Sequence, residues 1–395
     1  MNASCDAVVI GAGVCGLWVR FELARAGLRV VTLERTLMGD GQTIASQGIL
    51  HRGVKYAVSA SAREASEVLQ RVHTRWMDAM AGRSGPDLRG VHVLSRRTHM
   101  WSTPSMLGGA IAEAASRVMV SGVRRLGAGE VPAIFRGAPR GVRVWEIDEP
   151  VVDPRSLLAE LARATDGPIL RAPRPALHVA DSGARVELGD GRQVRAPRII
   201  LCAGEGNEAL LSSCGEDGAS MMQRRPLHMV VAQGAREAIY GHCLQASLSD
   251  KPRLTVTSTP EDGGAWTWYL GGNLAERGVD RNEASQIEAA REELRACLSW
   301  IGTDGLRFGT LRIDRAEGRT PAGLRPDSPV VRPLGPLVAV WPTKLALAPV
   351  AADEVARLVG EGSSERVSDE AWLRAESQLR GHTPDAAPLP WESRS

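Results

Sequence analysis

The segment ASQGILHRGVKYA, residues 45–57, carries several side chains that could do chemistry. Its histidine, His51, can accept a proton near neutral pH, as the oxidation of an alcohol or amine by hydride transfer requires. Two cations, Arg52 and Lys55, and the phenol of Tyr56 follow, and the segment contains no acid. This composition indicates a pocket for a small anion. A histidine in a glycine-flanked turn can equally be structural, so the segment alone leaves both roles open.

A glycine-rich turn near the start of the chain points to a dinucleotide. Gly11, Gly13 and Gly16 form a GxGxxG pattern between a short apolar run and a stretch of helical periodicity. Gly11 permits the tight turn, Gly13 lets the backbone approach a pyrophosphate, and Gly16 lets helix and strand pack closely. Glu34, at the end of the next strand, suits a ribose hydroxyl and disfavours a 2′-phosphate. The sequence therefore predicts a dinucleotide at this helix N-terminus, with a purely structural turn as the alternative.

The elements that must position these residues alternate between helix-type and strand-type patterns. Dinucleotide-type βαβ pieces occur at the start of the chain, near residues 145–211 and at the end, with strand-rich stretches between them. This order predicts an α/β fold in which a discontinuous Rossmann-like dinucleotide-binding domain carries an inserted β-sheet-rich substrate domain. We expect the first domain to comprise residues 1–80, 145–215 and 305–365, and the second residues 81–144 and 216–304. The polar, proline-bearing residues 376–395 are expected to form a flexible tail.

Composition argues against several classes of protein. The 395-residue chain has a formal net charge of +2 and scattered arginines, so nothing indicates a nucleic-acid partner. The six cysteines form no CxxC pair and stand at no zinc spacing with histidine, so we expect no metal site. The N-terminus has no basic region before its apolar run, and no stretch is long and apolar enough to span a membrane. We expect a cytoplasmic protein, and peripheral contact with the inner face of the membrane stays open.

Three features favour FAD over NAD as the dinucleotide. The motif begins within a dozen residues of the N-terminus, the stretch TIASQG follows the second strand, and RIILCAGEGNEALL is typical of the later flavoprotein segment that contacts the dinucleotide. With these features the chain resembles the D-amino-acid-oxidase-like FAD-dependent oxidoreductases, which include glycine oxidase, L-2-hydroxyglutarate oxidase and FAD-dependent glycerol-3-phosphate dehydrogenase. The resemblance covers nearly the whole chain in scattered blocks, of which the clearest are residues 6–56, 147–164, 195–211 and 320–360.

Within that family, SQGILHRGVKY is similar to two known segments. It resembles the His-x-Gly-Leu-Arg-Tyr segment of the glycerol-phosphate dehydrogenases and the His-Ala-Gly-x-Tyr-Tyr segment of the 2-hydroxyglutarate oxidases, both matched by His51, Gly53 and Tyr56. Lys55 stands where the glycerol-phosphate enzymes carry arginine, which keeps the cation but loses the bidentate fork. The resemblance implies that His51 accepts the proton or polarises the substrate beside flavin N5. Lys55 and Tyr56 would then hold the anionic end of the substrate.

Two later segments extend the resemblance. AGLRPDSPVV is similar to the family's Gly-Leu/Val-Arg-Pro segment, whose arginine binds the substrate carboxylate or phosphate, and this role carries over to Arg325. The alternative is a surface arginine. VWPTKLALAP occupies the place of the last FAD motif, where Lys344 and Leu345 match the Gly-Gly-Lys-Leu-Thr pattern of the glycerol-phosphate enzymes but the glycines are missing. The geometry of this loop therefore stays open, and Lys344 could contact flavin or substrate or be a solvated lysine.

Together these observations predict an FAD-dependent dehydrogenase or oxidase. Its expected reaction is the dehydrogenation of a small anionic CH–OH substrate, glycerol 3-phosphate-like or a 2-hydroxy acid, by hydride transfer to flavin N5, with quinone or oxygen as acceptor. The candidate catalytic residues are His51, Lys55, Tyr56, Arg325 and Lys344. The expected FAD contacts are Gly11, Gly13, Val14, Cys15, Gly16, Glu34, Arg35, Thr43, Ser46, Gln47, Gly48, Ala203, Gly204, Thr343, Lys344 and Leu345. An amino-acid or secondary-amine oxidase of the same family and a non-catalytic flavin-binding scaffold are the alternatives.

Overall fold

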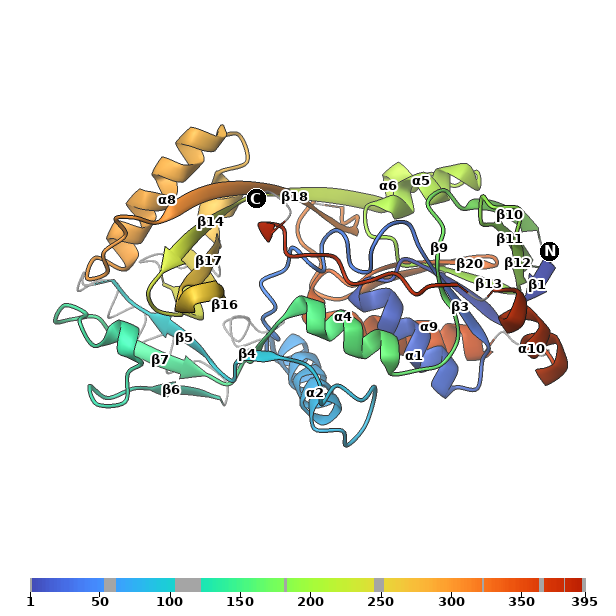
Figure 1. The fold of residues 1–395 in the computed structure, drawn as a ribbon, viewed down its shortest axis with the longest axis horizontal. Helices are drawn as coiled ribbons and strands as arrows, with labels where there is room; N and C mark the ends of the chain where they lie inside the picture. The colour runs from blue at the N-terminus through green and yellow to red at the C-terminus, as the bar shows by residue number, and fades with distance from the viewer. Residues whose placement is uncertain are drawn as a thin grey trace.

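Two large β-sheets organise the chain and lie at opposite ends of an elongated molecule (Figure 1). The computed structural model describes residues 2–52, 62–103, 122–180, 183–244, 252–321, 323–361, 366–379 and 381–392. The candidate residues Lys55 and Tyr56 lie outside these ranges. The arrangement confirms the predicted fold class, an α/β domain combined with a sheet-rich one.

The first large sheet has six strands in the order β19-β20-β13-β2-β3-β9. Five of the strands are parallel, and β19 pairs antiparallel at one edge. Their bounds are Ala7–Ile10 for β2, Val30–Glu34 for β3, Ile169–Arg171 for β9, Arg198–Leu201 for β13, Val330–Leu334 for β19 and Leu337–Trp341 for β20. The strands β2 and β20 consist entirely of buried apolar residues because both faces of a parallel sheet are covered.

Helices cover one face of this sheet, and a smaller sheet with further helices covers the other. The first layer contains α1 (Val14–Arg25), α2 (Ala62–Met80), α4 (Pro154–Arg163) and α9 (Ala348–Glu361). The second contains α5 (Gly206–Ser213), α10 (Asp369–Gln378) and the strands β1 (Asn2–Ser4), β10 (Ala176–Ala180), β11 (Gly183–Glu187) and β12 (Gln193–Ala196). Short α6 (Gly218–Met221) follows α5. In the described part of the chain, no helix has the length and apolar character that crossing a bilayer would need.

The second large sheet has eight strands in the order β18-β14-β17-β16-β15-β5-β7-β6. Their bounds are Thr98–Trp101 for β5, Val123–Arg125 for β6, Val144–Ile147 for β7, Met222–Ala235 for β14, Gly241–Cys243 for β15, Leu254–Pro260 for β16, Trp266–Gly271 for β17 and Arg307–Gly318 for β18. Helix α8 (Glu283–Cys297) packs on it through Ala290, Leu294 and Cys297. Helix α7 (Asn273–Arg277) lies beside β14 and β17. The predicted dinucleotide-binding domain includes residues 305–365, yet β18, which lies within that range, pairs with β14 of this sheet along its whole length.

The C-terminal residues 381–392 pack against the rest of the protein, so the prediction of a flexible tail is wrong for them. Ala386 forms a β-bridge with Met38, and Leu389 is buried. The ring of Trp391 lies 5.0 Å, between centroids, from that of Tyr269 in the second large sheet. Figure 1 shows this segment running from α10 across the molecule. The segment is mostly polar and rich in proline, but its few apolar side chains are enough to pack it against the rest of the protein.

Replacing Gly16 by alanine should disrupt the packing of α1 on β2. An added Cβ would lie 1.8 Å from the carbonyl oxygen of Gly11, and backbone cannot give way cheaply. We expect the free energy of unfolding to fall by at least about 2 kcal/mol, as overpacking typically costs. Gly360→Ala in α9 is the matched control, because nothing lies within 4 Å of its added Cβ. It should stabilise the protein by about 0.5–1 kcal/mol. Urea unfolding followed by circular dichroism measures both, and equal midpoints would contradict the packing argument.

Candidate active site

A cavity of about 1380 Å³ is lined by residues of both large sheets. It follows the carboxyl ends of the parallel strands β2, β3, β13 and β20, where open α/β sheets bind ligands. Of the residues singled out from sequence, it is lined by Gly11, Gly13, Val14, Cys15, Glu34, Arg35, Thr43, Ser46, Gln47, Gly48, His51, Ala203, Gly204, Arg325, Thr343, Lys344 and Leu345. Gly16 lies behind this surface, at the contact between α1 and the turn after β2.

One end of the cavity is formed by the turn between β2 and α1. Gly11 has a φ of +106°, and a Cβ there would lie 2.5 Å from the carbonyl oxygen of Cys202. Only glycine fits such a position without displacing backbone. Helix α1 begins at Val14, whose N–H donates to Thr43 Oγ1 at 3.2 Å. The positive end of this helix therefore borders the cavity and suits a pyrophosphate.

Glu34 ties the end of β3 to this turn. Its Oε2 accepts a hydrogen bond from the Ala12 N–H at 2.7 Å, and its Oε1 accepts one from the Arg35 N–H at 2.6 Å. The side chain also lines the cavity. Three backbone N–H groups, those of Ala12, Arg35 and Thr36, donate to this side chain. Because an ionised carboxylate offers about four acceptor positions, Glu34 can still receive a ribose hydroxyl. The turn, the helix end and this acid together fit the adenosine diphosphate part of FAD.

The segment Thr43–His51 runs between the two large sheets. The Gln47 side-chain amide donates to the Tyr269 carbonyl oxygen at 2.9 Å, and the Tyr269 hydroxyl donates to the Ala45 carbonyl oxygen at 3.1 Å. Burial raises the pKa of Tyr269, so the phenol stays a neutral donor. Gly48, with a φ of +66°, passes so close to β8 (Val151–Val152) that a Cβ would lie 2.1 Å from the Val152 carbonyl oxygen. Gln47, expected from sequence to contact FAD, thus also anchors the segment to the second sheet.

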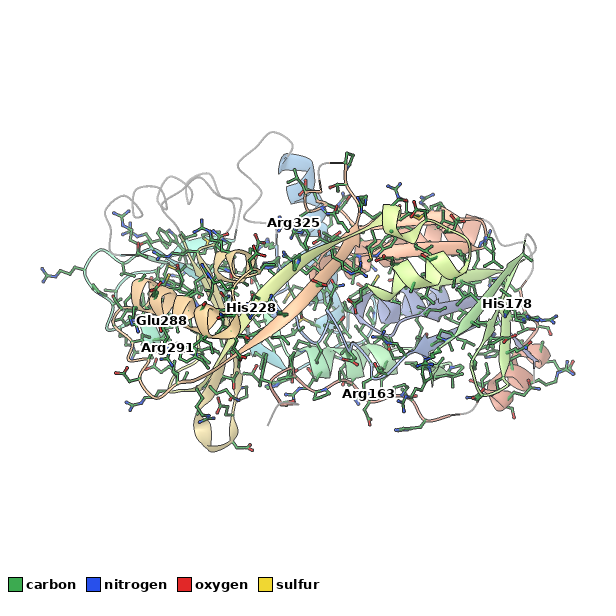
Figure 2. All side chains as sticks on the ribbon, turned by 90° about the horizontal axis from the view of Figure 1, so that it is seen from above. Arg163, His178, His228, Glu288, Arg291 and Arg325 are labelled. Carbon is green, nitrogen blue, oxygen red and sulfur yellow. The ribbon has the colours of Figure 1, made fainter. Side chains whose placement is uncertain are left out.

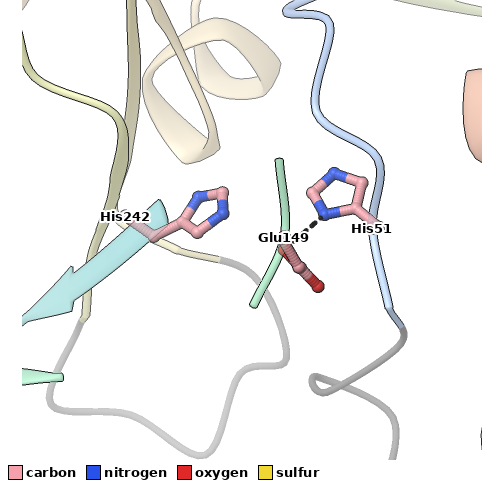
Figure 3. A group of neighbouring side chains, drawn as sticks. All are labelled: His51, Glu149 and His242. Atoms are coloured by element: carbon pink, nitrogen blue, oxygen red, sulfur yellow. Dashed lines mark hydrogen bonds and ion pairs between the residues drawn. The ribbon is translucent and has the colours of Figure 1, made fainter. Parts of the chain in front are cut away.

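His51 belongs to a compact group with Glu149 and His242 (Figure 3). Each contributes one donor or acceptor atom, and these atoms all lie within 4.8 Å of one another. His51 Nδ1 lies 3.1 Å from Glu149 Oε2, and the other carboxylate oxygen, Oε1, accepts the Arg52 N–H at 2.8 Å. His242 Nδ1 lies 2.9 Å from Thr255 Oγ1. The two imidazoles are stacked, with centroids 6.0 Å apart and planes inclined by 26°.

Sequence reasoning missed Glu149 and His242. Glu149 stands just before Pro150 in a stretch that indicated only a strand followed by a turn, and His242 lies in the three-residue strand β15 without a motif. One signal was available. The segment 45–57 holds a histidine and two cations but no acid, so a carboxylate had to come from elsewhere in the chain if the segment was to be buried.

A second carboxylate lies behind this group. Asp148 Oδ2 lies 3.1 Å from Arg52 NH1 and 3.7 Å from His73 Nε2. Burial, followed by the charge of Arg52, lowers the pKa of His73. His73, on α2, is only 6% exposed, which fits a structural role.

Arg325 lines the cavity from the loop between β18 and β19, near the middle of the molecule (Figure 2). The loop is held by two donors to the Leu324 carbonyl oxygen, the Gln223 side-chain amide and the Thr320 hydroxyl, each at 2.8 Å. This anchoring to β14 limits the positions that the Arg325 side chain can reach. A guanidinium held in this way suits the capture of a carboxylate or phosphate.

In the glycine-poor loop after β20, Thr343 adopts the left-handed backbone conformation that glycine usually takes. Its φ is +68°, which makes it the non-glycine residue with a left-handed backbone among those described. Such a conformation is strained for a β-branched residue, and strain of this kind gathers at functional sites. The Thr343 hydroxyl donates to the Ser328 carbonyl oxygen at 3.0 Å, which helps to hold it. Lys344 follows in the cavity wall and precedes the short helical turn Leu345–Leu347 that leads into α9.

Comparison with known proteins relates these features to one family. The family model described as DAO, FAD dependent oxidoreductase, matches residues 6–358. A probable FAD-dependent oxidoreductase from Pseudomonas aeruginosa is 40% identical over 364 residues, which cover 91% of this chain and 92% of that protein. The crystal structure of that oxidoreductase aligns with a TM-score of 0.81 and 37% identity, and covers 100% of this chain and 99% of that one.

Two more distant structures share the fold. Glycine oxidase from Geobacillus kaustophilus aligns with a TM-score of 0.65 and 15% identity over 93% of this chain and 98% of that one. L-α-glycerophosphate oxidase from Mycoplasma pneumoniae, with FAD bound, aligns with a TM-score of 0.65 and 14% identity over 98% of this chain and 99% of that one. At these identities the similarity extends to the architecture alone.

Changing Glu34 to glutamine should weaken FAD binding. The substitution keeps the size of the side chain but removes the charge that strengthens its hydrogen bonds to the turn and to a ribose hydroxyl. We expect the FAD dissociation constant to rise about 10- to 150-fold, corresponding to the roughly 1.5–3 kcal/mol typical of a hydrogen bond to a charged group. Titrating the apoprotein with FAD and following flavin fluorescence measures it. Glu130→Gln is the control, because Glu130 also accepts a backbone N–H, that of Gly127, but lies outside the cavity. Equal constants for the two variants would contradict the role of Glu34.

Proposed function

Because the chain belongs to the DAO family of FAD-dependent oxidoreductases, we propose that it dehydrogenates a small anionic substrate at a carbon bearing a hydroxyl group. The substrate class is a glycerol 3-phosphate-like compound or a 2-hydroxy acid. When bound, FAD supplies the acceptor for the hydride. The observation that carries the proposal is the presence of His51, Arg325 and Lys344 in the wall of the same cavity as the dinucleotide-binding turn.

Each of these side chains has a distinct task. His51 accepts the hydroxyl proton, since a neutral imidazole is a suitable base near pH 7. Arg325 binds the carboxylate or phosphate, for which the planar guanidinium offers paired donors. Lys344 adds a positive charge on the same cavity wall, and Lys55 and Tyr56 are proposed to contribute to the anion site from the segment that follows His51.

The second large sheet supplies an apolar wall. Leu227, Met229, Leu311 and Ile313 line the cavity from neighbouring positions on β14 and β18. Apolar surroundings exclude water from the reacting groups and strengthen the electrostatic attraction between a bound anion and the cations that hold it. We further propose oxygen or a quinone as the electron acceptor and a cytoplasmic location, with peripheral contact at the inner face of the membrane if the acceptor is a membrane quinone.

Oxidation of an amino acid or secondary amine is the second candidate. The fold is shared with glycine oxidase as well as with L-α-glycerophosphate oxidase, and an arginine in the cavity serves the carboxylate of an amino acid equally well. The two candidates differ in the group that loses its proton, a hydroxyl in one case and an amine in the other.

Anaerobic mixing with a panel of substrates separates these candidates. We expect glycerol 3-phosphate or a 2-hydroxy acid to bleach the flavin absorption near 450 nm, because His51 can take the hydroxyl proton as the hydride leaves. Bleaching by glycine or sarcosine, with no change on adding hydroxy compounds, would establish the amine oxidase instead. No bleaching by either class would favour the scaffold alternative.

Arg325→Lys should then raise KM for the reactive substrate at least about tenfold while changing kcat less, because the ammonium keeps the charge but loses the paired donors. Arg332→Lys is the matched control, since Arg332 is an exposed residue on β19 outside the cavity. Steady-state kinetics measures both variants. If the KM of Arg325→Lys equals the wild-type value, Arg325 does not bind the anionic group of the substrate.

A further inference from the structure

We propose that Glu149 is the positioning residue of His51. It holds the imidazole by Nδ1, so that Nε2 is the atom that receives the proton of the substrate, and it stabilises the ring once that proton has arrived. His242 is the third member of the group. Repulsion between two positively charged imidazoles limits the group to one added proton at a time. The identity of the proton donor rests on the proposed function, whereas the arrangement of the three side chains does not.

The chain brings Glu149 and His51 together through an antiparallel register. Ile49 forms an antiparallel β-bridge with Val151, and the Leu50 N–H donates to the Pro150 carbonyl oxygen at 2.9 Å. Continuing this register by one more step places residue 51 opposite residue 149. The pairing is therefore a consequence of backbone hydrogen bonds and not of a flexible side-chain encounter.

Hydrogen bonding fixes the tautomer of His51. An ionised carboxylate is only an acceptor, so the contact of 3.1 Å between Nδ1 and Glu149 Oε2 assigns the ring hydrogen to Nδ1. The Arg52 N–H occupies Oε1 and prevents the carboxylate from turning away. The Glu149 side chain is only 2% exposed, whereas that of His51 is 32% exposed. The ring thus connects a buried acid with the cavity.

Charge balance explains why a buried carboxylate is useful at this position. With two neutral imidazoles the group carries one negative charge, and proton transfer to His51 makes it neutral. A carboxylate behind a catalytic histidine acts in this way in serine proteases, where it holds the tautomer and stabilises the imidazolium without taking the proton. His242 Nδ1 is engaged with Thr255, and the stacked rings disfavour positive charge on both histidines at once.

The other charged groups around His51 either pair with another residue or form part of the cavity wall. Arg52 pairs with Asp148, whose side chain is 47% exposed and also faces His73. Arg325 and Lys344 line the same cavity. Glu149 is therefore the buried carboxylate in direct contact with His51 among the described residues.

The proton and electron balance of the step is complete with the proposed reaction. The substrate O–H bond breaks, and its proton goes to His51 Nε2 as the C–O double bond forms. The C–H bond breaks with its electron pair, which FAD, when bound, would accept as a hydride. The carbon is thereby oxidised by two electrons, and the proton on His51 later passes to solvent.

Glu149→Gln tests the proposal in the FAD-loaded enzyme. We expect kcat for the bleaching substrate to fall about 10²- to 10⁴-fold with little change in KM, because the ring loses its fixed tautomer. The acidic limb of the kcat/KM profile should move to lower pH, since a ring without its anionic partner gives up its proton more easily. Glu149→Asp should restore part of the rate. Glu146→Gln on β7 is the control, because Glu146 pairs with Arg97 and Arg124 and not with His51.

Nitrogen NMR of ¹⁵N-histidine-labelled protein gives a readout independent of turnover. We expect the His51 signals, assigned by their loss in His51→Asn, to report a proton on Nδ1 in the wild type and an averaged tautomer in Glu149→Gln. If no substrate is turned over but this tautomer change occurs, the proposed function fails and the positioning role stands. Unchanged signals and an unchanged rate would overturn the positioning role.

His51, Glu149 and His242 are also residue types that bind transition metals. The test must therefore distinguish a proton-accepting group from a metal site. Metal analysis of the purified FAD-loaded enzyme should find no bound zinc or iron in stoichiometric amount. One equivalent of metal that disappears in both Glu149→Gln and His242→Asn would overturn the proton role in favour of a metal centre.

Discussion

The architecture of the cavity depends on the backbone segment Gly48–Leu50, which is bound to residues 150–152 in an antiparallel register. Val152 donates its N–H to the Gly48 carbonyl oxygen at 3.0 Å, and Leu50 donates to Pro150. This contact requires a glycine at position 48, since a side chain would meet the Val152 carbonyl oxygen. It sets the direction of the chain after Gly48, and it places His51 opposite Glu149. A shift of one residue would reverse the side of every residue that follows.

The two sheets contribute different chemistry to the same cavity. The parallel sheet offers backbone amides, a helix end and the acid Glu34, which together suit the phosphates and ribose of a dinucleotide. The eight-stranded sheet offers side chains, the apolar row on β14 and β18 and the imidazole of His242 on β15. The segment Thr43–His51 joins the two through Gln47 and Tyr269, which connects the side of the cavity that fits a dinucleotide with its apolar wall.

Local patterns were readable from sequence, and contacts distant in sequence were not. The GxGxxG turn and the place of Glu34 at the end of the second strand each follow from a few neighbouring residues, and the structure has the turn between β2 and α1 and Glu34 at the end of β3. The pairing of His51 with Glu149 joins residues 98 positions apart through a β-register that no local pattern encodes. The left-handed backbone conformation of Thr343 could not be predicted from the sequence either, because propensity assigns that conformation to glycine or asparagine. Packing of residues 381–392 depends on a few apolar side chains in a sequence that otherwise favours disorder.

The buried carboxylate also bears on how a substrate can lie in the cavity. Glu149 places a negative charge behind His51, whereas Arg325 and Lys344 add positive charge to other parts of the wall. An anionic substrate would be repelled from the acid and attracted by the cations, with both effects strengthened by the apolar wall. Its hydroxyl-bearing carbon, the uncharged end, would then be the part that approaches His51. Under the proposed function, this electrostatic polarity would help to orient a small anionic substrate such as a glycerol 3-phosphate-like compound.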